Sequence, residues 1–430
     1  MNLRRVLFVA LAALALSNHV LFAQENPELP PGQIAFIGAD LNAYTVRVGS
    51  ESPMQLTEDA RTSGRSPRFY QWPTWSTDGR LALFASVFDR EDFIGTEVLI
   101  SGDGQLPATS AHLFDLDVFT YAYWSPQNCL DDAVCRDLAV LLTRPSAGGF
   151  VVELVRDLEA DDQAVLTDNG SPFYFSWSPD GTRMLWHRNN TDLDIYDTVE
   201  GEISSNLDAS AGAFGAPSWS PIDDRLLIAG LDLQNEREQL MIGSVDETVT
   251  PLVTGLQGPT AFLWSPDGQR IAYTDNRAEL VVVDASTGEE IRRSFQTGVV
   301  AFFWSPDSQK IAFITLSIDD PDQFSAKADI GARLASMQQP PVGLAWTVLD
   351  LAAETENTFS SFVPTNEQVY LLTFFDQFAQ SHRVWSPDSR HLVYAERVNG
   401  QEVISVLNTA QLFATPLKVA DGSIGIWSFQ

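Results

Sequence analysis

Hydrophobic positions along this chain fall into short runs of β-branched and aromatic residues, each bounded by Asp, Gly, Asn or Pro. In the clearest stretch, Ala-Phe-Leu-Trp264 precedes a Ser-Pro-Asp-Gly turn, which is followed by Ile271-Ala-Tyr273 and Leu280-Val-Val-Val283. Runs of this length and composition between turn residues are typical of β-strands. Helical periodicity is nearly absent, so we predict an all-β protein.

One phrase recurs eight times: Trp, then Ser, usually Pro and Asp, and then a turn residue. It begins at Trp75, Trp124, Trp177, Trp219, Trp264, Trp304, Trp385 and Trp427. The basic unit is about 40 to 45 residues, which is the length of one propeller blade of four strands. We therefore predict a single β-propeller, an architecture in which radially repeated sheets leave only short, protected edges.

The phrase at Trp427 supplies a first strand with no strands after it, whereas Ile34–Ile37 and residues 44–48 resemble strands that normally follow the phrase. We expect the N- and C-terminal segments to pair and close the ring. Counting that shared blade gives eight blades, with seven and nine as alternatives, because the long interval between Trp304 and Trp385 has room for a further blade. Where Ser308 and Ser389 replace the turn glycine, we expect a different turn type.

The first 23 residues differ from the rest of the chain. Arg4 and Arg5 precede an apolar run, and Leu21-Phe22-Ala23 offers a small-residue cleavage site. This pattern predicts a secretory signal peptide, because the apolar run is shorter than the roughly 20 residues that span a bilayer. We predict a propeller over residues 24–430, with a loop insertion at 317–341, in a periplasmic or secreted monomer without an integral membrane segment.

The two cysteines, Cys129 and Cys135, lie in one predicted loop. Export favours oxidation, and their separation can satisfy disulfide geometry, so we predict a disulfide. The alternative is a metal site, which would need more than two soft ligands.

The chain is strongly acidic, with a formal net charge of −31. Such a field repels phosphate backbones, so nucleic acid is excluded as an expected partner. The sequence contains no zinc-protease helix motif, no nucleophile elbow and no phosphate-binding glycine loop. We predict a non-enzymatic protein without a metal or other cofactor.

Two groups of residues are candidates for ligand or partner binding. The tight Asp-Gly turns lie on one face of a propeller, so the long insertions fall on the opposite face, together with a basic loop that contains Arg61, Arg65 and Arg68. Loops on a rigid scaffold commonly carry binding, and we expect a protein or peptide partner at this face. The alternative is that the insertions are merely tolerated.

The second group lies three residues before the repeated tryptophans, where side chains point to the opposite face of the inner strand. The bulky members are Trp72, Tyr121, Tyr174 and His382, while alanines occupy other units. They predict an asymmetric central channel with a pocket beside the alanines. The alternative is ordinary packing between blades.

Through Trp177-Ser-Pro-Asp-Gly181, Trp264-Ser-Pro-Asp-Gly268 and the variants at Trp304 and Trp385, the chain resembles the TolB-type, WD-repeat-like propeller family. The resemblance covers nearly all of the predicted mature chain. It implies a periplasmic protein-interaction role with partners at the mouth of the propeller.

We therefore expect an exported scaffold that binds a protein, a peptide or a cell-envelope ligand. Small-molecule or glycan binding is the first alternative. The second is a metal-dependent polysaccharide lyase, because oligogalacturonate lyases are similar propellers that bind a metal through several histidines. After the predicted signal peptide the histidines are His112, His187, His382 and His391.

Overall fold

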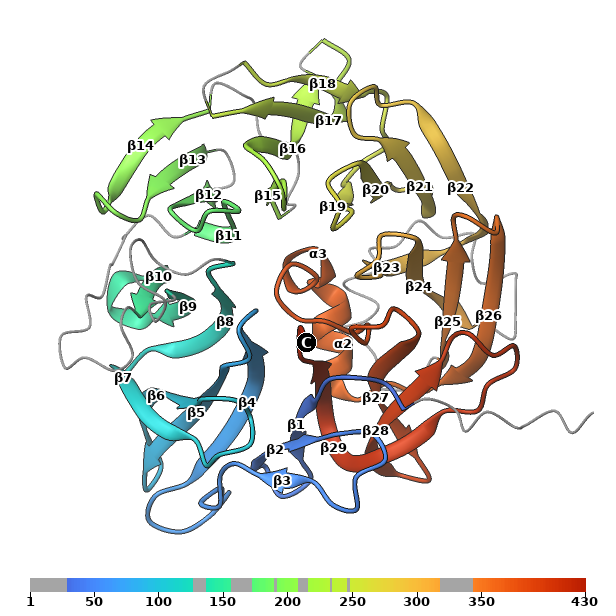
Figure 1. Cartoon of the computed structure of the whole chain (residues 1–430). Coiled ribbons are helices and arrows are strands. Elements are labelled where there is room, and N and C mark those ends of the chain that lie inside the picture. The colour runs from blue at the N-terminus through green and yellow to red at the C-terminus, as the bar shows by residue number, and fades with distance from the viewer. Residues whose placement is uncertain are drawn as a thin grey trace, which may run out of the picture.

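The computed structural model describes residues 29–126, 137–155, 172–188, 192–207, 216–232, 234–245, 248–317 and 343–430. Their strands form sheets arranged radially around one axis (Figure 1), which confirms the predicted all-β, single-propeller fold. The predicted signal peptide, both cysteines and nearly all of the insertion at 317–341 lie outside the described residues. No helix among those residues has the length and apolar character needed to cross a membrane.

Five sheets contain four antiparallel strands in sequence order. Their strands are β4 (Arg68–Trp75), β5 (Leu81–Asp89), β6 (Asp92–Ser101) and β7 (Thr109–Asp115); β11 (Pro172–Trp177), β12 (Arg183–Arg188), β13 (Asp192–Asp197) and β14 (Glu202–Asn206); β15 (Ser218–Trp219), β16 (Arg225–Asp232), β17 (Arg237–Ser244) and β18 (Thr250–Val253); β19 (Ala261–Trp264), β20 (Arg270–Thr274), β21 (Glu279–Asp284) and β22 (Glu290–Thr297); and β23 (Val299–Trp304), β24 (Lys310–Ser317), β25 (Gly343–Asp350) and β26 (Thr355–Phe362).

The two remaining sheets depart from this plan. One has three described strands, β8 (Val118–Trp124), β9 (Leu138–Arg144) and β10 (Gly149–Val155), with a 3-10 turn at Pro145–Ala147. The other has six strands in the order β27-β28-β29-β1-β2-β3. Its members are β27 (His391–Val398), β28 (Gln401–Asn408), β29 (Leu417–Trp427), β1 (Ile34–Gly38), β2 (Ala43–Val46) and β3 (Met54–Gln55).

The predicted count of eight blades is wrong, because the described residues form seven sheets. The difference arises in β29, an 11-residue strand that pairs with β28 through Leu417–Asp421 and with β1 through Gly422–Trp427. The units at Trp385 and Trp427, which the sequence counts separately, thus belong to one sheet. Gly422 lies at the change of partner, where an added Cβ would come within 2.4 Å of the carbonyl oxygen of Ile37.

The repeated tryptophan links five of the units to the unit before them, while the indole N–H groups of Trp75, Trp219 and Trp427 have no partner among the described residues. In these five units the indole N–H donates to a backbone carbonyl oxygen of the preceding unit. The acceptor is the residue immediately before the repeated tryptophan of that preceding unit. The bonds are Trp124 to Thr74 at 2.9 Å, Trp177 to Tyr123 at 3.1 Å, Trp264 to Ser218 at 3.3 Å, Trp304 to Leu263 at 3.3 Å and Trp385 to Phe303 at 3.0 Å. A buried indole N–H needs such a partner. The same tryptophan therefore buries apolar surface and orients its unit against the preceding one.

The serine and aspartate of the phrase stabilise the hairpin turn. In the unit at Trp264, the Ser265 hydroxyl donates to the Asp267 carboxylate at 2.5 Å and accepts the backbone N–H of Arg270 at 3.0 Å. The glycine that follows, Gly268, has a φ of 65°, which residues with a Cβ rarely adopt.

The expected change of turn type at Ser308 and Ser389 is not found. These residues have φ values of 60° and 58°, close to that of Gly268, and each donates its N–H to the serine of the phrase. Their hydroxyls accept the backbone N–H of Asp267 and Asp307 in the preceding turns, each at 3.0 Å. Serine thus tolerates the left-handed backbone while adding a bond between neighbouring units.

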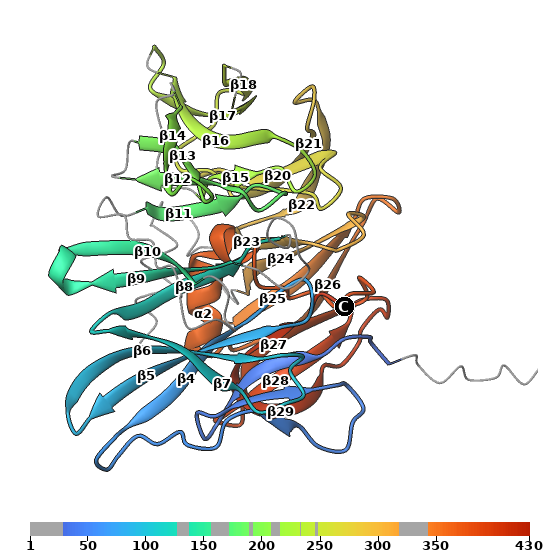
Figure 2. The same cartoon turned by 60° about the vertical axis from the view of Figure 1, so that its left-hand side comes forward.

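Two helices occupy the long interval after Trp304, where the sequence left room for another blade. Helix α2 (Asn366–Thr373) and helix α3 (Phe375–Phe378) lie at the centre of the ring in both views (Figures 1 and 2). The Thr365 hydroxyl caps α2 by accepting the N–H of Gln368 at 3.1 Å. After the helices, only isolated bridges at Arg383 and Trp385 represent the inner strand of this unit.

The indole bond between units can be tested with two matched substitutions. Trp385 and Trp427 are 1% and 0% exposed, but the Trp427 indole N–H has no partner among the described residues. Trp385→Phe should therefore destabilise the protein by about 0.5–1.5 kcal/mol more than Trp427→Phe, because only the first removes a hydrogen bond. Equal losses in denaturant unfolding would show that the indole bond contributes nothing.

Candidate functional site

The two helices fill the central channel with aromatic side chains. The ring of Phe378 lies at centroid distances of 4.7 Å from Trp72, 5.1 Å from Tyr121 and 5.1 Å from His382. Three of the four inner residues singled out in the sequence therefore meet around one helix. Burial and the charge of Asp376 raise the pKa of the fourth, Tyr174.

Polar contacts hold α3 to blades that are far apart in the sequence. The Gln377 side chain donates to the carbonyl of Phe175 at 2.9 Å and accepts the N–H of the same residue at 3.0 Å. The Tyr121 hydroxyl donates to the carbonyl of Gln377 at 3.1 Å and bonds to Ser381 at 2.5 Å. These bonds satisfy groups that would otherwise be buried without partners.

His382 serves this packing and is held in its neutral form. Its Nδ1 lies 2.7 Å from the Ser381 hydroxyl and its Nε2 lies 3.2 Å from the Thr74 hydroxyl. Burial lowers the pKa of His382 to about 3. Both ring nitrogens are thus occupied by neighbouring hydroxyls. In the described part of the chain, no three metal-ligating side chains gather into one group.

Asp376 is a half-buried carboxyl group on α3, inside the ring. One oxygen accepts the N–H of Ala216 at 2.9 Å and the other accepts the N–H of Gln377 at 3.1 Å. Burial is the main influence and raises the pKa of Asp376, because the charged form loses hydration.

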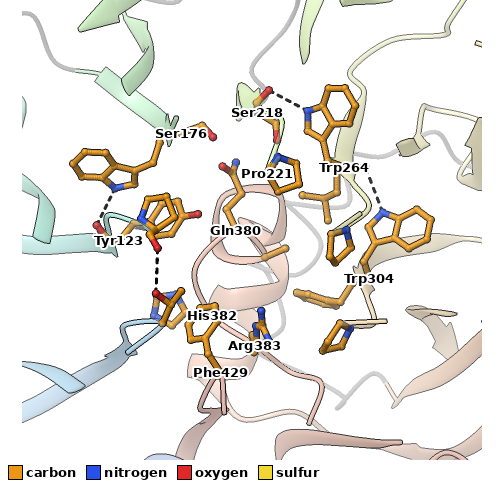
Figure 3. Close-up of a pocket in the computed structure, with 18 of the residues that line it drawn as sticks. Tyr123, Ser176, Ser218, Pro221, Trp264, Trp304, Gln380, His382, Arg383 and Phe429 are labelled. Carbon is orange, nitrogen blue, oxygen red and sulfur yellow. Dashed lines mark hydrogen bonds between the residues drawn. The ribbon is translucent and has the colours of Figure 1, made fainter. Parts of the chain in front are cut away.

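A cavity of about 360 Å³ opens above α3, on the face that carries the tight turns. Figure 3 shows Trp264, Trp304, Pro221 and Tyr123 around it. The wall consists mainly of the indole and proline rings of the repeated phrase. The prolines are Pro126, Pro179, Pro221, Pro266 and Pro306. We call this cavity the funnel.

The floor of the funnel is the segment that leaves α3. It contributes Ala379, Gln380, His382 and Arg383, of which Gln380 and Arg383 project towards the opening (Figure 3). Directly beneath them, Phe378 and Ser381 are buried in the channel packing. The funnel is therefore closed at its inner end.

Arg383 is the single charged side chain among the described residues that line the funnel, because burial keeps His382 neutral. Its guanidinium carbon lies 4.1 Å from the centroid of the Phe429 ring, and no carboxylate of the described residues pairs with it. Burial lowers the pKa of Arg383 to about 10, which leaves it cationic at neutral pH. Among the described residues, the funnel is thus an apolar site with one positive charge that no carboxylate pairs with.

The basic loop predicted as a partner surface lies away from the funnel, at the other end of β4. Arg61 and Arg68 exchange backbone hydrogen bonds, and the Arg68 guanidinium pairs with Glu97 and lies 3.5 Å from Asp59. Arg65 is exposed. A binding role for these arginines stays a prediction, as does a ligand role for Trp72, Tyr121, Tyr174 and His382, which here contact the protein's own helices.

Sequence reasoning missed the funnel because it placed the candidate binding surface on the face of the insertions, opposite the tight turns. In the sequence the prolines of the phrase are ordinary turn residues. Only the folded ring shows that five of them line the same cavity. Arg383 offered one clue, since it is a charged residue two positions before a repeated tryptophan, where the other units have Pro, Ala, Phe or Gly.

No protein-family model matches this sequence, and no curated protein matches it. Among solved structures, a eukaryotic initiation factor aligns with a TM-score of 0.52 and 11% identity, over 92% of this chain and 98% of that chain. TolB from Acinetobacter baumannii aligns with a TM-score of 0.40 and 15% identity, over 85% of this chain and 83% of that chain. The first likeness supports the propeller fold alone, and the TolB-type assignment stays a resemblance seen in the sequence.

The burial of Asp376 predicts a pH-dependent stability. The pKa of Asp376 is raised in the folded state. The stability that this carboxyl group contributes is therefore fully present below its usual pKa of 3.8, and it is lost as the pH rises through the pKa of Asp376 in the folded protein. We expect Asp376→Asn to become increasingly stable relative to the parent between pH 4 and pH 7.5.

Asp284→Asn serves as the control of opposite sign. Hydrogen bonds from Ser286 and Thr287 lower the pKa of Asp284 to about 2, so this substitution should cost more stability at neutral than at acid pH. Unfolding curves between pH 4 and pH 7.5 measure the effect of Asp376, and curves between pH 2 and pH 4 measure that of Asp284. A stability difference for Asp376→Asn that does not change with pH would contradict the assignment.

Proposed function

We propose that this protein is an exported, non-enzymatic interaction scaffold that binds a peptide segment of a partner protein in the funnel. The observation that carries the proposal is the wall of indole and proline rings around one unpaired guanidinium, Arg383. The pattern of the first 23 residues supports export to the periplasm or beyond.

The chemistry of the wall favours a peptide. Aromatic-lined grooves dock proline-rich segments, because the preformed polyproline II helix of such segments loses little conformational freedom on binding. The rings come from consecutive units of a rigid propeller, so the site is already formed before the ligand arrives, which lowers the cost of binding.

The arrangement of polar groups supports binding without catalysis. His382 is neutral, and its ring nitrogens bond to the hydroxyls of Ser381 and Thr74. No acidic side chain lines the funnel, which leaves Arg383 without a general base beside it in the described residues.

A small molecule or a glycan is the second candidate ligand. The funnel volume falls within the roughly 300–1,000 Å³ that is usual for small-ligand sites. The proposal therefore needs a test that separates the two ligand classes.

The site can be tested by blocking it. Ala379 lies in the floor, so Ala379→Trp should fill the funnel, whereas Leu412→Trp adds the same side chain on an outer loop where Leu412 is 65% exposed. We expect peptides selected from a random library to bind the parent and Leu412→Trp equally, and to bind Ala379→Trp at least about tenfold more weakly, a loss of about 1.4 kcal/mol.

Isothermal titration of each selected peptide gives the affinities, and circular dichroism shows that all three proteins are folded. Equal affinity for Ala379→Trp and the parent would place peptide binding elsewhere. Failure to select any peptide, together with glycan binding that Ala379→Trp abolishes, would favour the second candidate.

A further inference from the structure

We infer that Arg383 binds the C-terminal carboxylate of the peptide, so that the funnel receives the end of a partner chain. This inference rests on the proposed function and specifies its ligand. Three features support it: a closed inner end, an uncompensated cation at that end, and an acidic protein around it.

The closed end determines how a chain can enter. The buried side chains of Phe378, Ser381 and His382 fill the channel beneath the floor. Helix α2 also lies inside the ring and runs across its axis (Figures 1 and 2). A peptide therefore cannot pass through the ring, and a segment that reaches the floor must either end there or fold back within the funnel.

The cation at the floor suits a carboxylate. A guanidinium presents a planar set of donors that matches the two carboxylate oxygens, and such charge-assisted bonds are stronger than neutral ones. Phe429 stacks against one side of Arg383 and leaves its donors without a carboxylate partner in the described residues. The rings around Arg383 are mostly apolar and offer few competing hydrogen-bond acceptors to its guanidinium.

Gln380 adds a neutral contact beside Arg383. Its side-chain nitrogen donates to the carbonyls of Pro217 at 3.2 Å and Asp376 at 3.3 Å. Its side-chain oxygen accepts no bond from the described residues and can receive the last backbone N–H of the ligand. The last residue of a chain carries both a carboxylate for Arg383 and a backbone N–H for Gln380.

The overall charge favours a chain end over an acidic segment. The protein has a formal net charge of −31, so a peptide with several carboxylates would be repelled as it approached. A terminal carboxylate brings one negative charge on a chain whose other residues can be neutral or basic.

The inference can be tested without altering the protein. Random heptapeptides displayed on phage with free C-termini are selected on the parent, and each selected sequence is synthesised as a free acid and as a C-terminal amide. We expect amidation to weaken binding to the parent by at least about tenfold, because it removes the charge that Arg383 meets.

Two variants locate the effect. In Arg383→Gln, the acid and the amide should bind with affinities within about twofold of each other, because both have lost the charged partner. Arg390→Gln removes an exposed arginine elsewhere on the tight-turn face and should keep the full tenfold difference, which controls for long-range electrostatics.

The outcomes separate this inference from the proposed function. If acid and amide bind the parent equally while Ala379→Trp still abolishes binding, the funnel is the site and recognition of a chain end is wrong. The same conclusion follows if binding depends on an internal Asp or Glu of the peptide. If no peptide binds in the funnel, both the inference and the proposed function fail.

Discussion

The hydrogen bond from a repeated indole to the preceding unit is the constraint on which the rest of this structure depends. It joins side chains to backbone near the axis, where neighbouring sheets come closest, and so fixes the spacing and tilt of successive sheets. The serine and aspartate of the same phrase order the adjoining turn. Because the phrase is both a link and a turn, it also places a proline ring from five of the units around the axial opening. The wall of the funnel is therefore a by-product of how the ring is built.

A ring of this size leaves an axial space that its inner strands do not fill. Such a space would forfeit dispersion contacts on every inner side chain. The chain fills it with α2 and α3, whose Phe375 and Phe378 meet aromatic rings from several sheets. This packing closes the channel and leaves the funnel as a shallow site on one face. Binding at that site needs no rearrangement of the ring.

Much of the fold could be predicted from the sequence, because each phrase carries its own local chemistry: an indole for packing, a serine for the turn and a residue with positive φ. The blade count could not, since nothing in residues 417–427 shows that one strand serves two neighbours. The helices were missed because the segment after Thr365 buries the polar Gln368 and exposes the aromatic Tyr370, so it lacks the regular polar and apolar faces that reveal most helices. Trp72, Tyr121 and His382 were correctly assigned to the axis, but their partners lie far away in the sequence.

Those distant partners change how the molecule holds together. Repeat proteins whose units touch only their neighbours behave as nearly one-dimensional chains and can lose units one at a time. Here the segment after α2 joins His382 to Thr74, Tyr121 to Ser381 and Phe175 to Gln377, across sequence separations of 308, 260 and 202 residues. These contacts tie blades on different sides of the ring to one central element, as spokes are tied to a hub. A unit cannot detach without exposing this central segment to water. The ring therefore unfolds cooperatively, as a globular domain does, although it is built from repeated units.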